Sequence, residues 1–135
     1  MPRFNLNPLF QFLFIDQVRL VELFSGLNLL AWASLILGRP EVLQRDSYVA
    51  FSALPASAWV VIFGVSGLFQ LCVTFWNSEY RTEMRFFAMF FATSCWALIA
   101  LSFVASGVGQ TATMNYLLLT ISCAMSGGFL AWKHF

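Results

Sequence analysis

The chain has 135 residues, of which 60% are hydrophobic and only 10% are charged, and its seven basic and six acidic side chains give a net charge of +1. An average soluble domain carries about 25% charged residues, so this composition is typical of a membrane protein, with one domain over residues 1–135. The near balance of charge implies no polyanionic partner, and we expect no nucleic-acid partner.

The N-terminal stretch, residues 4–14, mixes phenylalanine and leucine with asparagine, proline and glutamine. Such a mixture is typical of a segment that lies along the membrane surface, with its aromatic rings at the level of the lipid headgroups. Because the polar residues interrupt the apolar run and no small-residue cleavage site follows nearby, we expect no signal peptide. The segment is predicted to lead directly into the first membrane span.

Four long apolar stretches follow, at about residues 18–38, 57–77, 86–106 and 114–132. A helix needs about 20 mostly apolar residues, each rising about 1.5 Å, to cross the hydrocarbon core of a bilayer. Positions 86–132 hold no charged side chain, and a small polar cluster at 106–111 divides this run into two spans. The sequence therefore predicts an all-α fold, an integral membrane four-helix bundle with an interfacial N-terminal segment.

The connections between the spans carry most of the charges, which predict the orientation. With both termini in the cytoplasm, that side would hold Arg3, Arg19, Arg81, Arg85 and Lys133, and the opposite side Arg39 and Arg45. Since basic residues gather on the cytoplasmic side of membrane proteins, we expect cytoplasmic N- and C-termini. Residues 79–85 are expected to form a charged inner loop, and the long connection at 39–56 is expected to contain a short interfacial helix.

Asp16, Arg19 and Glu22 occur at three-residue spacing where the first span begins, and we call them the charged stripe. At about 100° per helical residue they fall on one side of the helix, which Gly26 continues deeper into the membrane. An ionised group at the bilayer centre costs about 2.5 to 3.5 kcal/mol on insertion scales. We therefore expect Arg19 to pair with both carboxylates.

Two interpretations of the charged stripe stay open. One makes Asp16 or Glu22 a proton or cation site, as ionisable groups within membranes often are. The other makes the stripe a structural network at the helix end that docks the surface segment or a partner. Its position in the first turns of the span favours the structural interpretation.

Other polar and small residues lie deeper in the spans. Asn28 and Gln70 are expected to form hydrogen bonds across helix interfaces rather than to contact a ligand. Small residues that let helix backbones approach closely, within one chain or between chains, are Gly26, Gly64, Gly67, Ser122, Ser126 and Gly128. The three cysteines lie inside apolar stretches and are expected to act as small apolar side chains.

Signatures of catalysis and of cofactor binding are missing from the sequence. The only histidine, His134, is the penultimate residue, so a histidine-based haem or zinc site and a Ser-His-Asp triad all lack parts. No glycine-rich phosphate loop followed by lysine and serine or threonine is present. We therefore predict no catalytic residue, no metal site and no cofactor, and expect that the chain is not an enzyme.

One family resemblance can be drawn from residues along most of the chain. They are Arg19-xx-Glu22-xxx-Gly26, Tyr48 through Leu54-Pro55, Trp59, Gly64 and Gly67, and Arg85 with Trp96. In these the chain resembles small phage-encoded membrane proteins, some of them described as holin-like. The resemblance implies an origin in a tailed phage or prophage, insertion in the bacterial inner membrane and action by self-association. The chain departs from many holins in its four predicted spans and in having no charged tail beyond Lys133 and His134.

The leading hypothesis is a non-enzymatic membrane protein that self-associates or docks on another membrane assembly and perturbs the membrane in a holin-like way. Its expected partners are the lipid bilayer and either further copies of the chain or another membrane protein. Two alternatives remain. One is a small transporter or channel that uses Asp16 or Glu22, and the other is the membrane-anchor subunit of a larger complex.

Overall fold

The computed structural model describes residues 8, 16–76, 79–107 and 111–134. These residues form four long helices, α2 (Gln17–Gly38), α3 (Ala56–Phe75), α4 (Arg81–Ala105) and α5 (Thr111–His134), and two short 3-10 helices, η1 (Pro40–Gln44) and η2 (Asp46–Ala53). Each of the four helices is long and apolar enough to cross a membrane. The predicted all-α four-helix membrane bundle is confirmed, whereas the predicted surface segment at 4–14 lies almost wholly outside the described residues.

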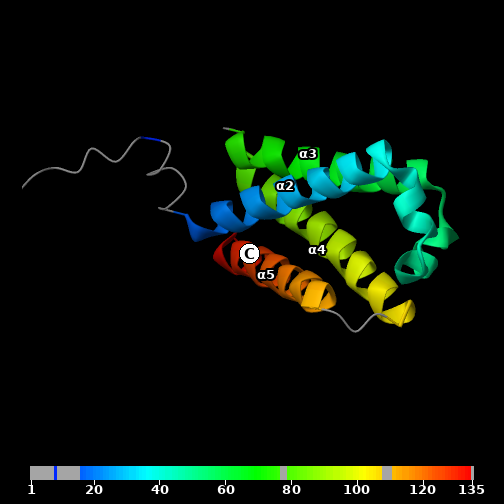
Figure 1. The fold of residues 1–135 in the computed structure, drawn as a ribbon. Helices are drawn as coiled ribbons and strands as arrows, with labels where there is room; N and C mark the ends of the chain where they lie inside the picture. Colours follow the sequence, from blue (N-terminus) through cyan, green and yellow to red (C-terminus); the bar gives the residue numbers. More distant parts are fainter. Residues whose placement is uncertain (1–7, 9–15, 77–78, 108–110, 135) are drawn as a thin grey trace, which may run out of the picture.

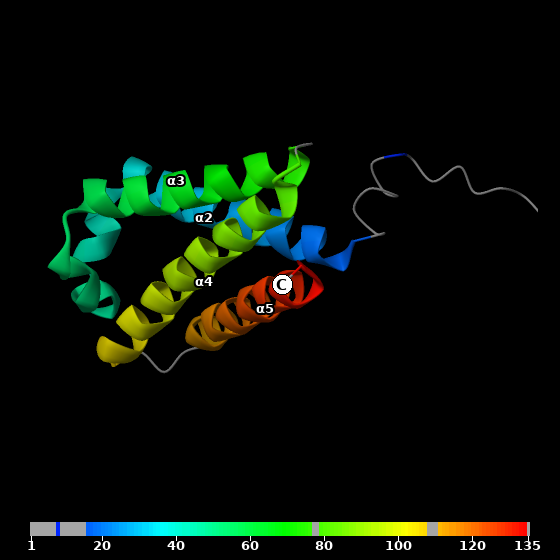
Figure 2. The ribbon, with the colours of Figure 1, turned by 180° about the vertical axis from the view of Figure 1, so that it is seen from behind.

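The helices form two hairpins, α2 with α3 and α4 with α5, which are joined where α4 packs on α3 (Figures 1 and 2). Successive helices run in opposite directions. The start of α2, the end of α3, the start of α4 and the end of α5 therefore gather at one end of the bundle, which we call the inner end (Figure 1). The opposite, outer end carries η1 and η2 (Figure 1).

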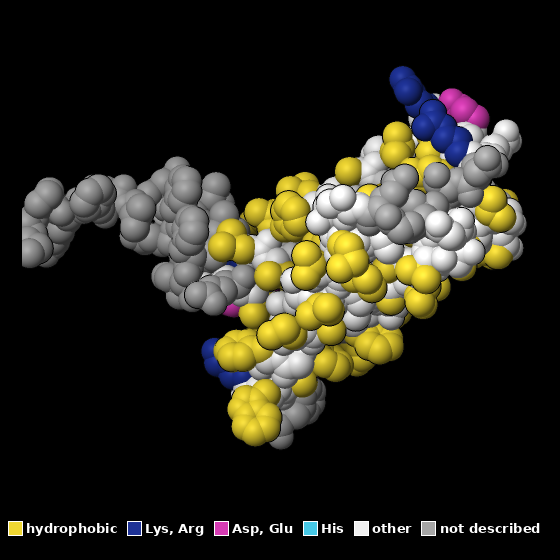
Figure 3. Space-filling model, turned by 60° about the horizontal axis from the view of Figure 1, so that its bottom comes forward, with side chains coloured by type: hydrophobic (Ala, Val, Ile, Leu, Met, Phe, Trp, Pro, Cys, Tyr) yellow, Lys and Arg dark blue, Asp and Glu magenta, His cyan; other side chains and the backbone are white. Residues whose placement is uncertain are grey.

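The outer surface of the bundle is apolar on all four helices, where Phe24, Val61, Phe90 and Leu118 are among the exposed side chains. In the face drawn in Figure 3, hydrophobic side chains cover the middle, and the visible Lys, Arg, Asp and Glu side chains lie toward the ends. A contiguous apolar surface of this kind would be a liability in water and suits the hydrocarbon core of a bilayer. The distribution of exposed residues thus agrees with the membrane composition of the helices.

The helix boundaries agree with the predicted spans to within three residues, except at the start of α4. This helix begins at Arg81 rather than at position 86, so Arg81, Glu83 and Arg85 belong to the helix and not to a loop. Straight-chain residues such as arginine, glutamate and methionine favour helix, which explains the extra turn. As a consequence, Arg85 is held by the backbone of α4, and the residue as a whole is only 5% exposed.

Glycines bring α2 and α3 into close contact. A Cβ atom built on Gly67 would lie 2.9 Å from the carbonyl oxygen of Gly26, and one built on Gly26 would lie 2.9 Å from Cγ of Leu71. Gly64 faces Ala33 with ordinary spacing of 3.7 Å. The predicted packing residues on these two helices therefore serve contacts inside the chain.

Aromatic side chains fill the outer end of the bundle. Rings packed around Trp32 come from Tyr48, Phe51, Phe63, Phe103 and Tyr116. Phe51 of η2 is fully buried, and its carbonyl accepts a 2.8 Å hydrogen bond from Nε1 of Trp59. The outer connection, where the sequence predicts a short helix, forms the 3-10 helices η1 and η2 and packs into the bundle through Phe51, whose ring occupies a buried aromatic site.

Candidate functional site

The candidate site is a buried charge network at the inner end, centred on Arg85 of α4. Its Nε donates to Oε1 of Glu22 at 2.8 Å, and its Nη1 donates to Oδ2 of Asp16 at 2.9 Å. The Arg85 and Glu22 side chains are 6% and 1% exposed, so this pair lies out of contact with solvent or lipid headgroups. A planar guanidinium suits this role because its fixed fork of donors can serve two carboxylates at once.

Thr74 of α3 completes the network. Its hydroxyl lies 3.1 Å from Oε2 of Glu22 and 2.8 Å from the carbonyl oxygen of Gln70, so its one proton is shared between two acceptors. Thr74 is fully buried. The Glu22 carboxylate on α2 is thereby bound to both α3 and α4, and the network ties three helices together.

Asp16 caps the start of α2 and extends the network toward the surface. Its Oδ1 accepts from the backbone N–H of Val18 at 3.1 Å. Burial raises the pKa of Asp16, but the hydrogen bond and the charge of Arg85 outweigh burial and hold this pKa below its ordinary value. Asp16 is therefore ionised at neutral pH, which suits its place at the positive end of the helix dipole.

The structure differs from the sequence prediction in the partner of the two carboxylates. The spacing of the charged stripe predicts Arg19, but Arg85 occupies that place, and Nε of Arg19 lies 3.8 Å from Oδ2 of Asp16. Arg85 is 63 positions from Glu22 in the sequence, so helical spacing gives no signal for this pair. The topology does give one, since antiparallel spans place the start of α4 at the same end as the start of α2.

All four carboxylate oxygens of Asp16 and Glu22 have donors in this network, from Arg85, Thr74 and the Val18 backbone. Both carboxylates are paired with Arg85, and the Glu22 side chain is 1% exposed, so a carried cation would compete with the guanidinium and have to displace it. In a buried ion pair, loss of one partner costs about 3–5 kcal/mol, which makes such displacement unfavourable. The geometry therefore favours the structural interpretation of the charged stripe.

The polar side chains expected at depth lie in different settings. Gln70 is fully buried, and its Nε2 lies 3.3 Å from Sδ of Met89 on α4, so it does reach across a helix interface. Asn28 instead donates to the carbonyl oxygen of Phe24 on its own helix at 2.8 Å. A buried hydrogen bond that the sequence did not suggest joins Nε1 of Trp96 to Oγ of Ser25 at 2.8 Å.

The small residues of α5 divide between three sides of the helix. Cys123 and Gly127 are buried, and a Cβ atom on Gly127 would lie 3.4 Å from Cβ of Met89 on α4. Ser122 and Ser126 line hollows between α5 and α2. A Cβ atom on Gly128 would meet none of the described residues within 4 Å. The predicted residues Ser122, Ser126 and Gly128 thus point away from the α4 contact.

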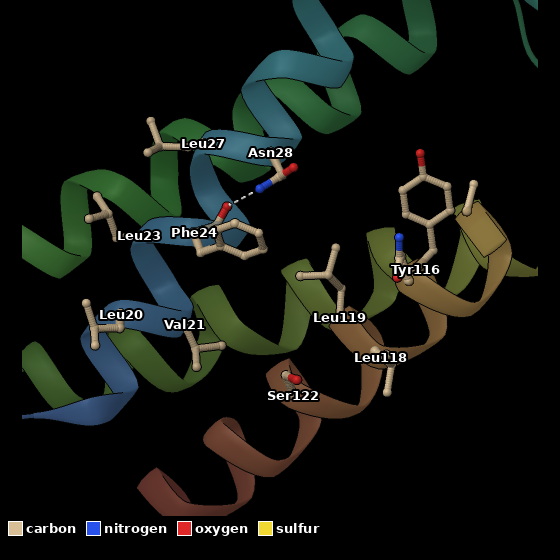
Figure 4. A pocket seen from close by; sticks show the side chains of 12 residues that line it. Leu20, Val21, Leu23, Phe24, Leu27, Asn28, Tyr116, Leu118, Leu119 and Ser122 are labelled. Atoms are coloured by element: carbon tan, nitrogen blue, oxygen red, sulfur yellow. Dashed lines mark hydrogen bonds between the residues drawn. The ribbon is translucent and has the colours of Figure 1, made fainter.

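Two hollows separate α2 from α5 because the two hairpins diverge there. A groove of about 940 Å³ runs between them, with an α2 wall that includes Leu23 and Phe24 and an α5 wall that includes Leu118 and Leu119 (Figure 4). A second hollow of about 590 Å³ lies at the inner end and is lined by Asp16, Val18, Arg19, Val21, Met125, Ser126, Phe129 and Lys133. We call these the apolar groove and the inner cavity.

Within the described part of the chain, no group of three or more histidine, cysteine, aspartate or glutamate side chains is arranged to hold a metal ion. Comparison with protein-family models, curated proteins and solved structures found no match to this chain. The geometry of the described residues is that of a small polytopic membrane protein with a buried charge network at one end, and the function is inferred from that geometry.

Proposed function

We propose that this chain acts without catalysis, as a membrane subunit that self-associates through the outward side of α5. The observation that carries the proposal is the open space at Gly128. Gly26, Gly64 and Gly67 of α2 and α3 face neighbours inside the chain, whereas a Cβ atom on Gly128, like one on Gly38 at the end of α2, would meet no described residue within 4 Å. A small residue that is unused within a bundle lets the backbone of another helix approach closely.

The neighbourhood of Gly128 supports this surface. Ala124 lies one turn before it and is also exposed, which gives an Ala-xxx-Gly pair on the side turned away from both α4 and the apolar groove. Leu117 and Ile121 extend the same side and are exposed as well. Only 22% of the membrane window of α5 is buried, compared with 39–44% for the other three helices. A second copy packed on this side would form a two-fold symmetric pair of α5 helices.

The association can be tested by measuring the oligomeric mass of the full chain in detergent and in nanodiscs. Gly128→Leu and Ala124→Leu should shift the chain from dimer to monomer, because each adds bulk where two backbones would meet. Ala31→Leu is a matched control on the exposed side of α2 and should leave the dimer intact. A monomeric wild-type chain, or equal disruption by Ala31→Leu, would overturn the proposal.

Transport is the alternative class that uses Asp16 or Glu22. The pairing of both carboxylates with Arg85 weighs against it, since the guanidinium already occupies the place of a carried cation and the Glu22 side chain is 1% exposed. A proton flux across proteoliposomes that Glu22→Gln abolishes would favour transport over association.

The physiological setting that we propose follows the resemblance noted in the sequence: a phage-encoded protein in the bacterial inner membrane, with cytoplasmic termini and a holin-like effect. Expression in bacteria while membrane potential is recorded tests this setting. Loss of potential with the wild-type chain, and its retention with Gly128→Leu, is the expected result. Quiet accumulation at full potential would favour a role as the anchor of another assembly.

A further inference from the structure

The two hollows between α2 and α5 adjoin and change in chemistry along their length. Val21 lines both of them. The apolar groove is walled mainly by leucine, valine and phenylalanine. Its lining also includes two amides, Asn28 and Asn115, of which Asn28 lies at the end away from Leu20 and Val21 (Figure 4). The inner cavity adds Arg19, Lys133 and the hydroxyl of Ser126. The apolar groove and the inner cavity together form an apolar space with cationic and hydroxyl donors at one end. Such a space suits an amphiphile with an anionic headgroup.

The position of the inner cavity also fits the lipid headgroup level. Lys133 is at the end of the last membrane span and Arg19 is in the first turn of α2. Trp132, which is 88% exposed, precedes Lys133. Tryptophan and basic residues are enriched at this depth of membrane proteins, where the aromatic ring lies among headgroups.

The net charge of the side chains that line the inner cavity complements the single negative charge of a phosphodiester group. Asp16 also lines the cavity, but its carboxylate accepts from Arg85 at 2.9 Å. Among the side chains that line the cavity, Arg19 and Lys133 are basic and Asp16 is acidic, which leaves one positive charge. An anionic phospholipid supplies one negative charge, and its acyl chain would replace loose bilayer lipid along the apolar groove.

We propose that the space between α2 and α5 is a binding site for one anionic phospholipid, with its phosphate against Arg19 and Lys133 and an acyl chain along the apolar groove. The site is distinct from the association surface, because Ser122 and Ser126 lie on the side of α5 that faces α2 and Gly128 does not. The bound lipid would bridge the two hairpins at the place where their helices diverge.

Native mass spectrometry of the detergent-purified full chain tests the site with added phosphatidylglycerol or phosphatidylcholine as probes. The wild-type chain should retain one phosphatidylglycerol in preference to phosphatidylcholine. A basic residue near an anionic headgroup contributes about 1 kcal/mol, so Lys133→Gln should weaken retention about fivefold and Arg19→Gln with Lys133→Gln about 30-fold. Lys133 is exposed and outside the buried network, so its single variant keeps the fold.

Two further variants decide between occupants. Arg39→Gln with Arg45→Gln removes the same number of charges at the outer end and should leave retention unchanged. Ser122→Trp fills the apolar groove and should reduce retention without changing the dimer formed through Gly128. Equal retention of both lipids by the wild-type chain would overturn the proposal. So would a lipid-free dimer that Ser122→Trp abolishes, because the groove would then hold a second copy.

Discussion

Replacement of Arg85 by methionine is the sharpest perturbation of the inner end. Methionine has a similar unbranched length but no charge, so Glu22 keeps Thr74 as its only network partner while its side chain remains 1% exposed. Breaking a buried ion pair by removing one partner typically costs about 3–5 kcal/mol. We expect the free energy of unfolding to fall by about that amount. Asp16 contributes little to the loss, since its side chain is 29% exposed and can be hydrated.

Two comparison variants separate the network from a general effect of lost charge. Arg19→Met removes a guanidinium that lies 3.8 Å from Asp16, and should cost about 1 kcal/mol or below. Arg85→Met combined with Glu22→Leu replaces the buried pair by apolar side chains. Such replacements are often neutral, so the double variant should recover most of the stability lost in Arg85→Met.

The assay is unfolding of the purified chain in mixed micelles of increasing SDS fraction, followed by tryptophan fluorescence and circular dichroism. The midpoints and slopes give the differences in free energy between variants. If Arg19→Met destabilised the chain as much as Arg85→Met, Arg19 would be the central cation and the network described here would be wrong. If the double variant were less stable than Arg85→Met alone, the unpaired Glu22 carboxylate would not be the cause of the lost stability.

Two further predictions follow from single contacts. Gly67→Ala places a methyl group 2.9 Å from the Gly26 carbonyl and should lower the free energy of unfolding in the same assay. Gly128→Ala, where a Cβ atom meets none of the described residues within 4 Å, should leave that free energy unchanged or raise it by about 1 kcal/mol through helix propensity. Equal effects of the two substitutions would contradict the close α2–α3 contact. Because the pKa of Asp16 is lowered by folding, its contribution to stability should be fully present above its ordinary pKa of about 3.9 and be lost as the pH falls through the lower folded value. Asp16→Asn should flatten this part of the pH–stability curve, and a slope unchanged by the substitution would assign it to another group.

The membrane spans could be predicted from the sequence because their signal is local. An uncharged run such as 86–132 and the polar break within it fix the number of helices and their approximate ends. Small residues likewise indicated where α2 and α3 approach, and Gly26 and Gly67 do meet there. These features depend on length and on side-chain size, both of which are read directly from the chain.

The charge network could not be predicted in the same way, because it depends on contacts between distant segments. The spacing of Asp16, Arg19 and Glu22 favours a pairing within one helix, but Arg85 approaches from α4 with a better donor geometry. Phe51 similarly enters the outer end only because Trp32 and Trp59 leave an aromatic site for it. The divergence of α2 from α5, which creates both hollows, results from packing of the hairpins and has no counterpart in the sequence pattern.

The central claim is that four helices cross a membrane in alternating directions, with the inner ends on one side. The most direct test is side-specific labelling of single cysteines in sealed vesicles, in a chain whose native Cys72, Cys95 and Cys123 are replaced by alanine. With an impermeant maleimide, Tyr80→Cys and Lys133→Cys should react from the same side of the membrane, and Ser52→Cys should react from the opposite side. Reaction of Ser52→Cys from the same side as Tyr80→Cys would contradict the arrangement of the helices and, with it, the account of the inner end.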